Sequence, residues 1–179
     1  MNARSEIDLL YHEGPAEAGP TTRAARGWWR LALTGVALYA ATVLVLGVYW
    51  SVQPGRFDVR AVAVDRLGGE SELVPGAVTV STIKRVAETL LEKPGGYIHN
   101  DVTLPGLYLD NMPSWEYGAL KELRDALRSL RNDFSRSQTQ SIENANLRKA
   151  DALLNYDVNS WILPTTESEY RSGIDALGR

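Results

Sequence analysis

An uninterrupted apolar run, Leu31–Tyr49, limits what this chain can fold into more than any other feature. It contains no charged residue, and at about 1.5 Å of rise per residue a helix of this length spans the roughly 30 Å hydrocarbon core of a bilayer. A core helix of a soluble domain is rarely apolar on every face over such a length. Trp28, Trp29 and Trp50 flank the run, where amphipathic rings favour the headgroup layer. We therefore predict a transmembrane helix over residues 28–50, with the lipid bilayer as its partner.

The arginines on either side of this helix indicate its orientation. Arg23, Arg26 and Arg30 crowd the amino end with no acidic residue among them, whereas the two arginines beyond the carboxyl end lie further away and have an aspartate between them. Because basic residues near a span favour the cytoplasmic side, we expect a cytoplasmic amino terminus and an outer carboxyl part. A cleaved signal peptide is the alternative, but its apolar region is about 7–15 residues long. The small-x-small triplet at residues 61–63 also lies well beyond the run, so we favour an uncleaved anchor.

Small residues within the run suggest a contact between two copies of the helix. Ala37 and Ala41 are four residues apart, with glycines nearby, and this spacing lets helix backbones approach closely. Small residues are also common in membrane helices generally, so we expect at most a weak homodimer through this face.

The composition excludes several classes of function. The formal net charge of −3 is too small and too evenly mixed for a nucleic-acid-binding protein. The chain has no cysteine, so it forms neither disulfides nor thiolate metal sites. The part beyond the apolar run is long enough for one modest domain.

Breaks in composition divide the chain into four parts. Residues 1–27 are polar and rich in glycine and proline, which predicts a disordered cytoplasmic tail ahead of the membrane helix. Residues 51–77 read as a juxtamembrane linker, in which Phe57–Val64 alternates weakly and predicts a short strand or an extended segment. Residues 78–179 show helical periodicity, so we predict an all-α fold of one membrane helix and one small helical domain.

Two apolar stripes mark the main helices of that domain. The first covers Val80–Leu91 and ends at Pro94-Gly95-Gly96. The second begins near Pro113–Ser114, with Glu116 expected at the positive end of the helix dipole. Its seam, with steps of three and four, consists of Leu120, Leu123, Leu127, Leu130 and Phe134.

The remaining segments predict two shorter helices. After the polar stretch Ser135–Ser141, a helix is expected over Ile142–Leu154, followed by an extended connection in which Trp161 and Ile162 serve as apolar anchors. Thr166-x-x-Glu169 resembles a capping box that opens a last helix. That helix has no obvious partner left in the sequence, so we expect the chain to be truncated at its carboxyl end.

The loop Tyr97–Met112, between the two main helices, holds the candidate functional residues. It is too apolar for a free linker, so we expect it to lie packed on the helices. The candidate interaction surface on this loop and the following helix start consists of Tyr97, His99, Asp101, Tyr108, Asp110, Trp115 and Glu116.

Chemistry at this loop is the less favoured interpretation. A histidine beside carboxylates can bind a divalent metal or transfer protons, but no His-x-x-x-His, His-Glu-x-x-His or EF-hand spacing is present. Aspartate and asparagine in turns more often bond local backbone amides, as we expect for Asn100. The aromatic residues fit a core, with a peptide or glycan groove as the alternative. We therefore assign no catalytic, metal or cofactor-binding residue.

Several segments together resemble one protein family. They are PGGYIHNDVTLPG (Pro94–Gly106), LDNMPSWEYGAL (Leu109–Leu120), DFSRSQTQS (Asp133–Ser141), NYDVNSWILP (Asn155–Pro164) and EYRSGI (Glu169–Ile174). The family is the uncharacterised domain of unknown function 2333 of proteobacterial envelopes. The resemblance implies an inner-membrane anchor and a mostly helical periplasmic domain, in proteins longer than this chain. It brings no established activity and so no catalytic residues.

Two functions are consistent with these features. The first is a membrane-tethered helical interaction or scaffold protein of the bacterial cell envelope, with an unknown envelope protein as partner. The alternative is an envelope hydrolase or metal-dependent enzyme with its site on residues 97–116.

Overall fold

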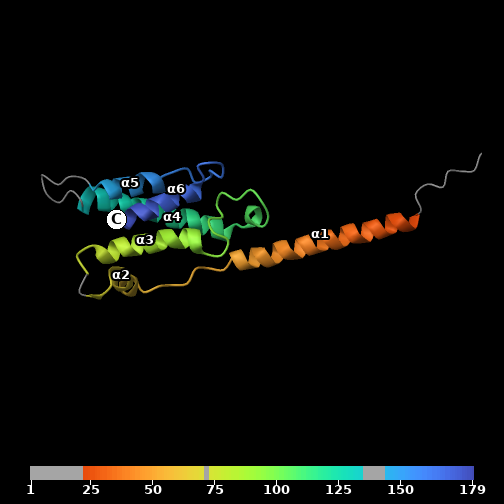
Figure 1. The fold of residues 1–179 in the computed structure, drawn as a ribbon, viewed down its shortest axis with the longest axis horizontal. Helices are drawn as coiled ribbons and strands as arrows, with labels where there is room; N and C mark the ends of the chain where they lie inside the picture. The colour runs from red at the N-terminus through yellow and green to blue at the C-terminus, as the bar shows by residue number, and fades with distance from the viewer. Residues whose placement is uncertain (1–21, 71–72, 135–143) are drawn as a thin grey trace, which may run out of the picture. The chain divides into compact units, whose positions relative to one another are not determined.

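The computed structural model describes residues 22–70, 73–134 and 144–179. Every regular element in these ranges is a helix (Figure 1), so the expected all-α fold is confirmed there. The chain divides into two units, residues 1–42 and 43–179. The first unit contains most of the amino-terminal helix, and the second contains its last two turns and all later helices.

The amino-terminal helix α1, Thr22–Trp50, contains the apolar run. Its segment Gly27–Trp50 is long and apolar enough to cross a membrane and is not buried by the protein itself. Thr34 and Thr42 satisfy their hydroxyl groups within the helix, each donating to the carbonyl oxygen four residues earlier at 2.9 Å. Residues 1–21 of the expected tail lie outside the described residues, whereas residues 22–27 belong to α1. Their alanines and arginines are good helix formers, which explains the early start.

Residues 51–77, expected to be a linker, contain a second helix, α2, Val59–Leu67. The prediction of a strand or extended segment for Phe57–Val64 is therefore wrong. Asp58 caps the helix by accepting the Ala61 N–H at 2.7 Å, and Gly68 ends it with a φ of 79°. These two caps outweigh a weak alternation that spans too few residues to define a strand.

Four further helices form a closed bundle (Figure 1). They are α3 (Ala77–Glu92), α4 (Asn111–Ser129), α5 (Ala145–Leu154) and α6 (Thr166–Leu177). Each contacts the next, and α6 also contacts α3, which closes the ring; α2 packs on the outside of α3. The core is built from the inward faces of the four helices. Four-helix packing of this kind places the apolar seams of the helices at the centre.

The apolar seam predicted for α4 is confirmed. Leu120, Leu123, Leu127 and Leu130 are all buried, with Leu127 completely inaccessible. Beyond α4 the chain continues as a short π-helical segment, η3, Leu130–Phe134. The side chain of Phe134 and the polar stretch Ser135–Ser141 lie outside the described residues.

The last helix, α6, does have partners, contrary to expectation. It packs against α5 and α3, and contributes Tyr170 and Ile174 to the core. At Gly173 the approach to α5 is so close that a Cβ would lie 3.0 Å from Leu154 Cγ. The sequence pattern did not show this contact because a glycine in place of an apolar side chain interrupts the stripe.

The cap of α6 is one residue earlier than predicted. Thr165 accepts the Ser168 N–H at 3.3 Å, whereas Thr166 is fully buried inside the first turn. The Thr166 hydroxyl lies 2.8 Å from the carbonyl oxygens of both Asp157 and Ser160. Thr166 therefore ties the α5–α6 connection to α6.

Candidate functional site

A tight reversal after α3 brings the loop back onto the bundle. Gly95 and Gly96 have φ values of 86° and 68°, a left-handed conformation that side-chain-bearing residues rarely adopt. A Cβ on Gly95 would also lie 2.8 Å from the indole ring of Trp50. These two glycines allow the following residues, Tyr97–Asn100, to run beside the start of α4.

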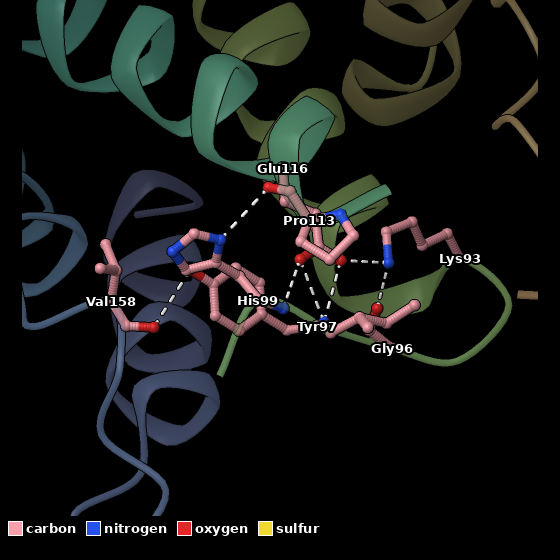
Figure 2. Close-up of polar contacts among 8 residues, drawn as sticks. Lys93, Gly96, Tyr97, His99, Pro113, Glu116 and Val158 are labelled. Carbon is pink, nitrogen blue, oxygen red and sulfur yellow. Dashed lines mark hydrogen bonds and ion pairs between the residues drawn. The ribbon is translucent and has the colours of Figure 1, made fainter. Parts of the chain in front are cut away.

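The centre of this arrangement is the carboxylate of Glu116, which is completely buried. It accepts the backbone N–H of Ile98 at 2.9 and 3.1 Å and that of His99 at 2.7 Å. It also forms an ion pair with Lys93, whose ammonium group donates to the carbonyl oxygen of Gly96 (Figure 2). We call these five residues the Glu116 clamp.

Burial dominates the electrostatics of the clamp. It raises the pKa of Glu116 above its ordinary value, while the Lys93 ammonium and the N–H groups of Ile98 and His99 act in the opposite direction. The side chains of Lys93 and Glu116 are 1% and 0% exposed. Removing either group would therefore leave the other as a buried, uncompensated charge or polar group, which is strongly destabilising. The predicted dipole role of Glu116 is wrong, because α4 begins at Asn111 and has no acidic residue in its first turn.

Tyr97 is a core residue rather than part of a surface. It is 4% exposed and packs edge-on against Tyr170, with ring centroids 5.5 Å apart. Its hydroxyl lies 3.4 Å from the carbonyl oxygen of Val158 (Figure 2). Burial raises the pKa of Tyr97, so the hydroxyl stays protonated as a donor. Of the aromatic residues proposed for a groove, this one belongs to the bundle interior.

His99 is held from two sides. Its Nδ1 lies 3.2 Å from the carbonyl oxygen of Pro113, and its ring stacks on Tyr117 at a centroid distance of 5.6 Å and an angle of 18°. Tyr117 and Trp115 are both exposed. The histidine therefore positions the loop against the first turns of α4.

The two loop aspartates do not join His99 in a common site. The side chain of Asp101 packs against Gly106, where an added Cβ would overlap it. Burial, with a smaller contribution from Glu167, raises the pKa of Asp101. Asp110 occupies the N-cap position of α4 but makes no capping bond. Across the described residues, no three His, Cys, Asp or Glu side chains are grouped so that they could hold a metal ion.

Asn100 joins the loop to a distant part of the chain. Its side-chain amide donates to the carbonyl oxygen of Ser160 at 3.0 Å and to Glu167 at 3.2 Å. The predicted bond to a local backbone amide is wrong for this residue, because burial at 6% exposure places it against the α5–α6 connection instead.

The remainder of the loop does not pack down as predicted. Leu107 and Tyr108, in the 3₁₀ turn η2, Gly106–Tyr108, are 62% and 79% exposed. The expected packing is therefore correct for Tyr97 and Ile98 but wrong for these two side chains. Of the predicted surface residues, Tyr97 and Glu116 are buried, whereas Tyr108, Asp110 and Trp115 are exposed.

One signal in the sequence could have revealed the clamp. Glu116 lies four residues after Met112 and four before Leu120, on the buried seam of α4. A charged residue on an apolar stripe needs a buried partner. Lys93 carries no comparable signal. Nor does Arg124, which caps α5 by donating to the carbonyl oxygens of Leu154 and Tyr156, both at 2.8 Å.

These features define an all-helical protein that has one amino-terminal helix apolar enough to cross a membrane and an internally braced loop on a four-helix bundle. The model of the domain of unknown function 2333 family, described as an uncharacterized protein conserved in bacteria, matches residues 22–179. The chain belongs to this family, which confirms the resemblance seen in the sequence. No curated protein and no solved structure matches the chain.

Proposed function

We propose that this protein is a membrane-tethered helical interaction or scaffold module of the bacterial cell envelope. Its α1 helix would cross the inner membrane once, with the amino terminus in the cytoplasm and the bundle in the periplasm. The observation that carries this proposal is that the charged group at the centre of the candidate site is already bonded within the protein. The Glu116 carboxylate binds three partners within the protein, so it braces the loop and is not free to act on a substrate.

Length, composition and charge support the membrane part of the proposal. The segment Gly27–Trp50 meets the requirements for a span. Arg23, Arg26 and Arg30 lie at its amino end, and basic residues favour the cytoplasmic side. Family membership supports a bacterial source.

A reporter fusion tests the tether and its orientation. A reporter active only in the periplasm, fused after Arg179, should be active and remain in the membrane fraction. A reporter active only in the cytoplasm, fused at the same position, should be inactive. Activity of the cytoplasmic reporter would overturn the orientation, and release of the periplasmic reporter into the soluble fraction would overturn the uncleaved anchor.

A metal titration distinguishes the scaffold from the enzyme. An envelope hydrolase or metal-dependent enzyme with its site on residues 97–116 needs His99, Asp101 and Asp110 to act on one ligand. Calorimetric titration of the full chain in detergent with zinc or magnesium should show no binding that is lost in H99A or D101N. Binding that both variants remove would favour the enzyme. Glu122→Gln, an exposed position on α4, is the matched control.

A further inference from the structure

Two uncharged segments of the bundle expose large apolar side chains. Residues 102–109 contain no charged residue between Asp101 and Asp110, and residues 158–166 contain none between Asp157 and Glu167. We call their six exposed apolar side chains the apolar rim. It consists of Val102, Leu107, Tyr108, Trp161, Ile162 and Leu163, with exposures of 50, 62, 79, 58, 72 and 88%. The predicted role of Trp161 and Ile162 as internal anchors is therefore wrong.

The two segments belong to one end of the bundle. The loop that contains the first segment follows α3, and the connection that contains the second joins α5 to α6; Figure 1 shows both at the same end of the four helices. The Asn100 amide, two residues before the first segment, donates to the carbonyl oxygen of Ser160 in the second. The two segments that carry the six side chains thus lie at one end of the bundle, although they are far apart in the sequence.

Two contacts at the end of α1 show how far along the apolar run the loop after α3 lies. A Cβ added at Gly47 would lie 3.6 Å from Pro105 Cβ, and Pro105 is buried. Trp50 lies against Gly95 in the same way. These contacts are all within the unit 43–179. Because Gly47 lies within the apolar run, Pro105 and the adjoining η2 turn are at the depth where that run ends.

We infer that the apolar rim is a second membrane contact, seated in the outer leaflet at the boundary between headgroups and hydrocarbon. This inference rests on the proposed membrane span of α1. Pro105, which lies between Val102 and Leu107 in the sequence, lies against Gly47 of that span, and this proximity favours lipid over a protein partner as the occupant. Leucine, tyrosine and tryptophan are suited to this boundary, and several exposed large apolar side chains at one end of a domain indicate an interaction site.

The acidic residues agree with this placement. Asp101, Asp110, Asp157 and Glu167 stand at the ends of the two uncharged segments, so the segments that would contact lipid carry no charge themselves. The clamp and the Asn100 amide hold both segments from within the protein. The bundle is then fixed against the bilayer at two places, the span and the rim, and presents its other end to the periplasm.

Site-directed spin labelling tests the inference, since the chain has no native cysteine. The full chain with a single substitution, L107C or L163C, is labelled and reconstituted in vesicles of phosphatidylethanolamine and phosphatidylglycerol. Collisions of the label with oxygen, which concentrates in lipid, are compared with collisions with a water-soluble nickel complex. V45C, on the apolar run, reports the bilayer, and E122C, exposed on α4, reports water. Circular dichroism checks that each variant is folded.

The expected result is an oxygen-to-nickel ratio at residues 107 and 163 several-fold above that at residue 122 and close to that at residue 45. A ratio at 107 and 163 equal to that at 122, with residue 45 in lipid, would overturn the rim and leave the span intact; the rim would then face a protein. A water-like ratio at residue 45 would overturn the span itself, and the rim with it. The two failures are therefore distinguishable.

Discussion

The loop between α3 and α4 consists of two halves with opposite properties. Residues 97–100 are buried at three of four positions and are held by a buried ion pair and by side-chain amide bonds. Residues 102–109 are uncharged and expose Leu107 and Tyr108. The first half carries the buried polar contacts of the loop beside two core side chains, whereas the second half exposes large apolar side chains, which is uncommon in a soluble domain. The difference indicates that the first half fixes the loop while the second half stays exposed.

Removing the Glu116 carboxylate should lower the free energy of unfolding most, because it acts on the buried half of the loop. In Glu116→Ala the Lys93 ammonium stays buried without its partner, so the free energy of unfolding should fall by about 3–5 kcal/mol. Urea unfolding of the full chain in detergent micelles, followed by circular dichroism, measures this. Glu122→Ala, exposed on the same helix, should change it by less than about 0.5 kcal/mol. Equal effects of the two variants would contradict a structural clamp.

Gly95→Ala should have the next largest effect. A residue with a side chain is strained at a φ of 86°, and its Cβ would lie 2.8 Å from the Trp50 ring, so we expect a loss of about 2 kcal/mol. Gly118→Ala on α4, where a Cβ meets nothing within 4 Å, should instead stabilise by up to about 1 kcal/mol. The same unfolding measurement compares them. A neutral Gly95→Ala would show that the reversal tolerates another backbone conformation.

Asn100→Ala should weaken the link between the loop after α3 and the α5–α6 connection, with a smaller loss of stability. The carbonyl oxygen of Ser160 keeps its bonds from the Thr166 N–H and hydroxyl, and the half-buried Glu167 loses one donor, so the free energy of unfolding should fall by about 1 kcal/mol. Amide exchange by mass spectrometry should show faster exchange in residues 158–166, with residues 120–127 unchanged. Unchanged exchange in both regions would mean that the bond does not couple them.

Tyr108→Ser should change stability least. Because Tyr108 is 79% exposed, the free energy of unfolding in micelles should shift by less than about 0.5 kcal/mol. Tyr97→Ser, the matched change in the buried half, should cost about 3–5 kcal/mol as a large-to-small core substitution. If the two tyrosines gave similar losses, the division of the loop into a buried and an exposed half would be wrong.

Much of the fold was predictable because its signals are local. The α3 and α4 stripes repeat every three to four residues, and the leucines of α4 are buried as predicted. The α5–α6 connection was predicted less well, since Trp161 and Ile162 look like core residues by type alone but are exposed. For the candidate site, the sequence indicated the loop correctly but did not indicate its bonding partners. Lys93 and Asn100 contact residues 23 and 67 positions away, and a local pattern does not show such contacts.

The sequence by itself determined the apolar helix, the helical class and the family, since length, periodicity and composition are properties of neighbouring residues. Only the tertiary structure decided which polar groups are buried and which apolar ones are not. Burial depends on what the rest of the chain places against a residue: Glu116 is enclosed because the loop after α3 folds over it. Leu107 is open because no part of the described chain covers it. Such contacts join distant segments, and no local pattern specifies them.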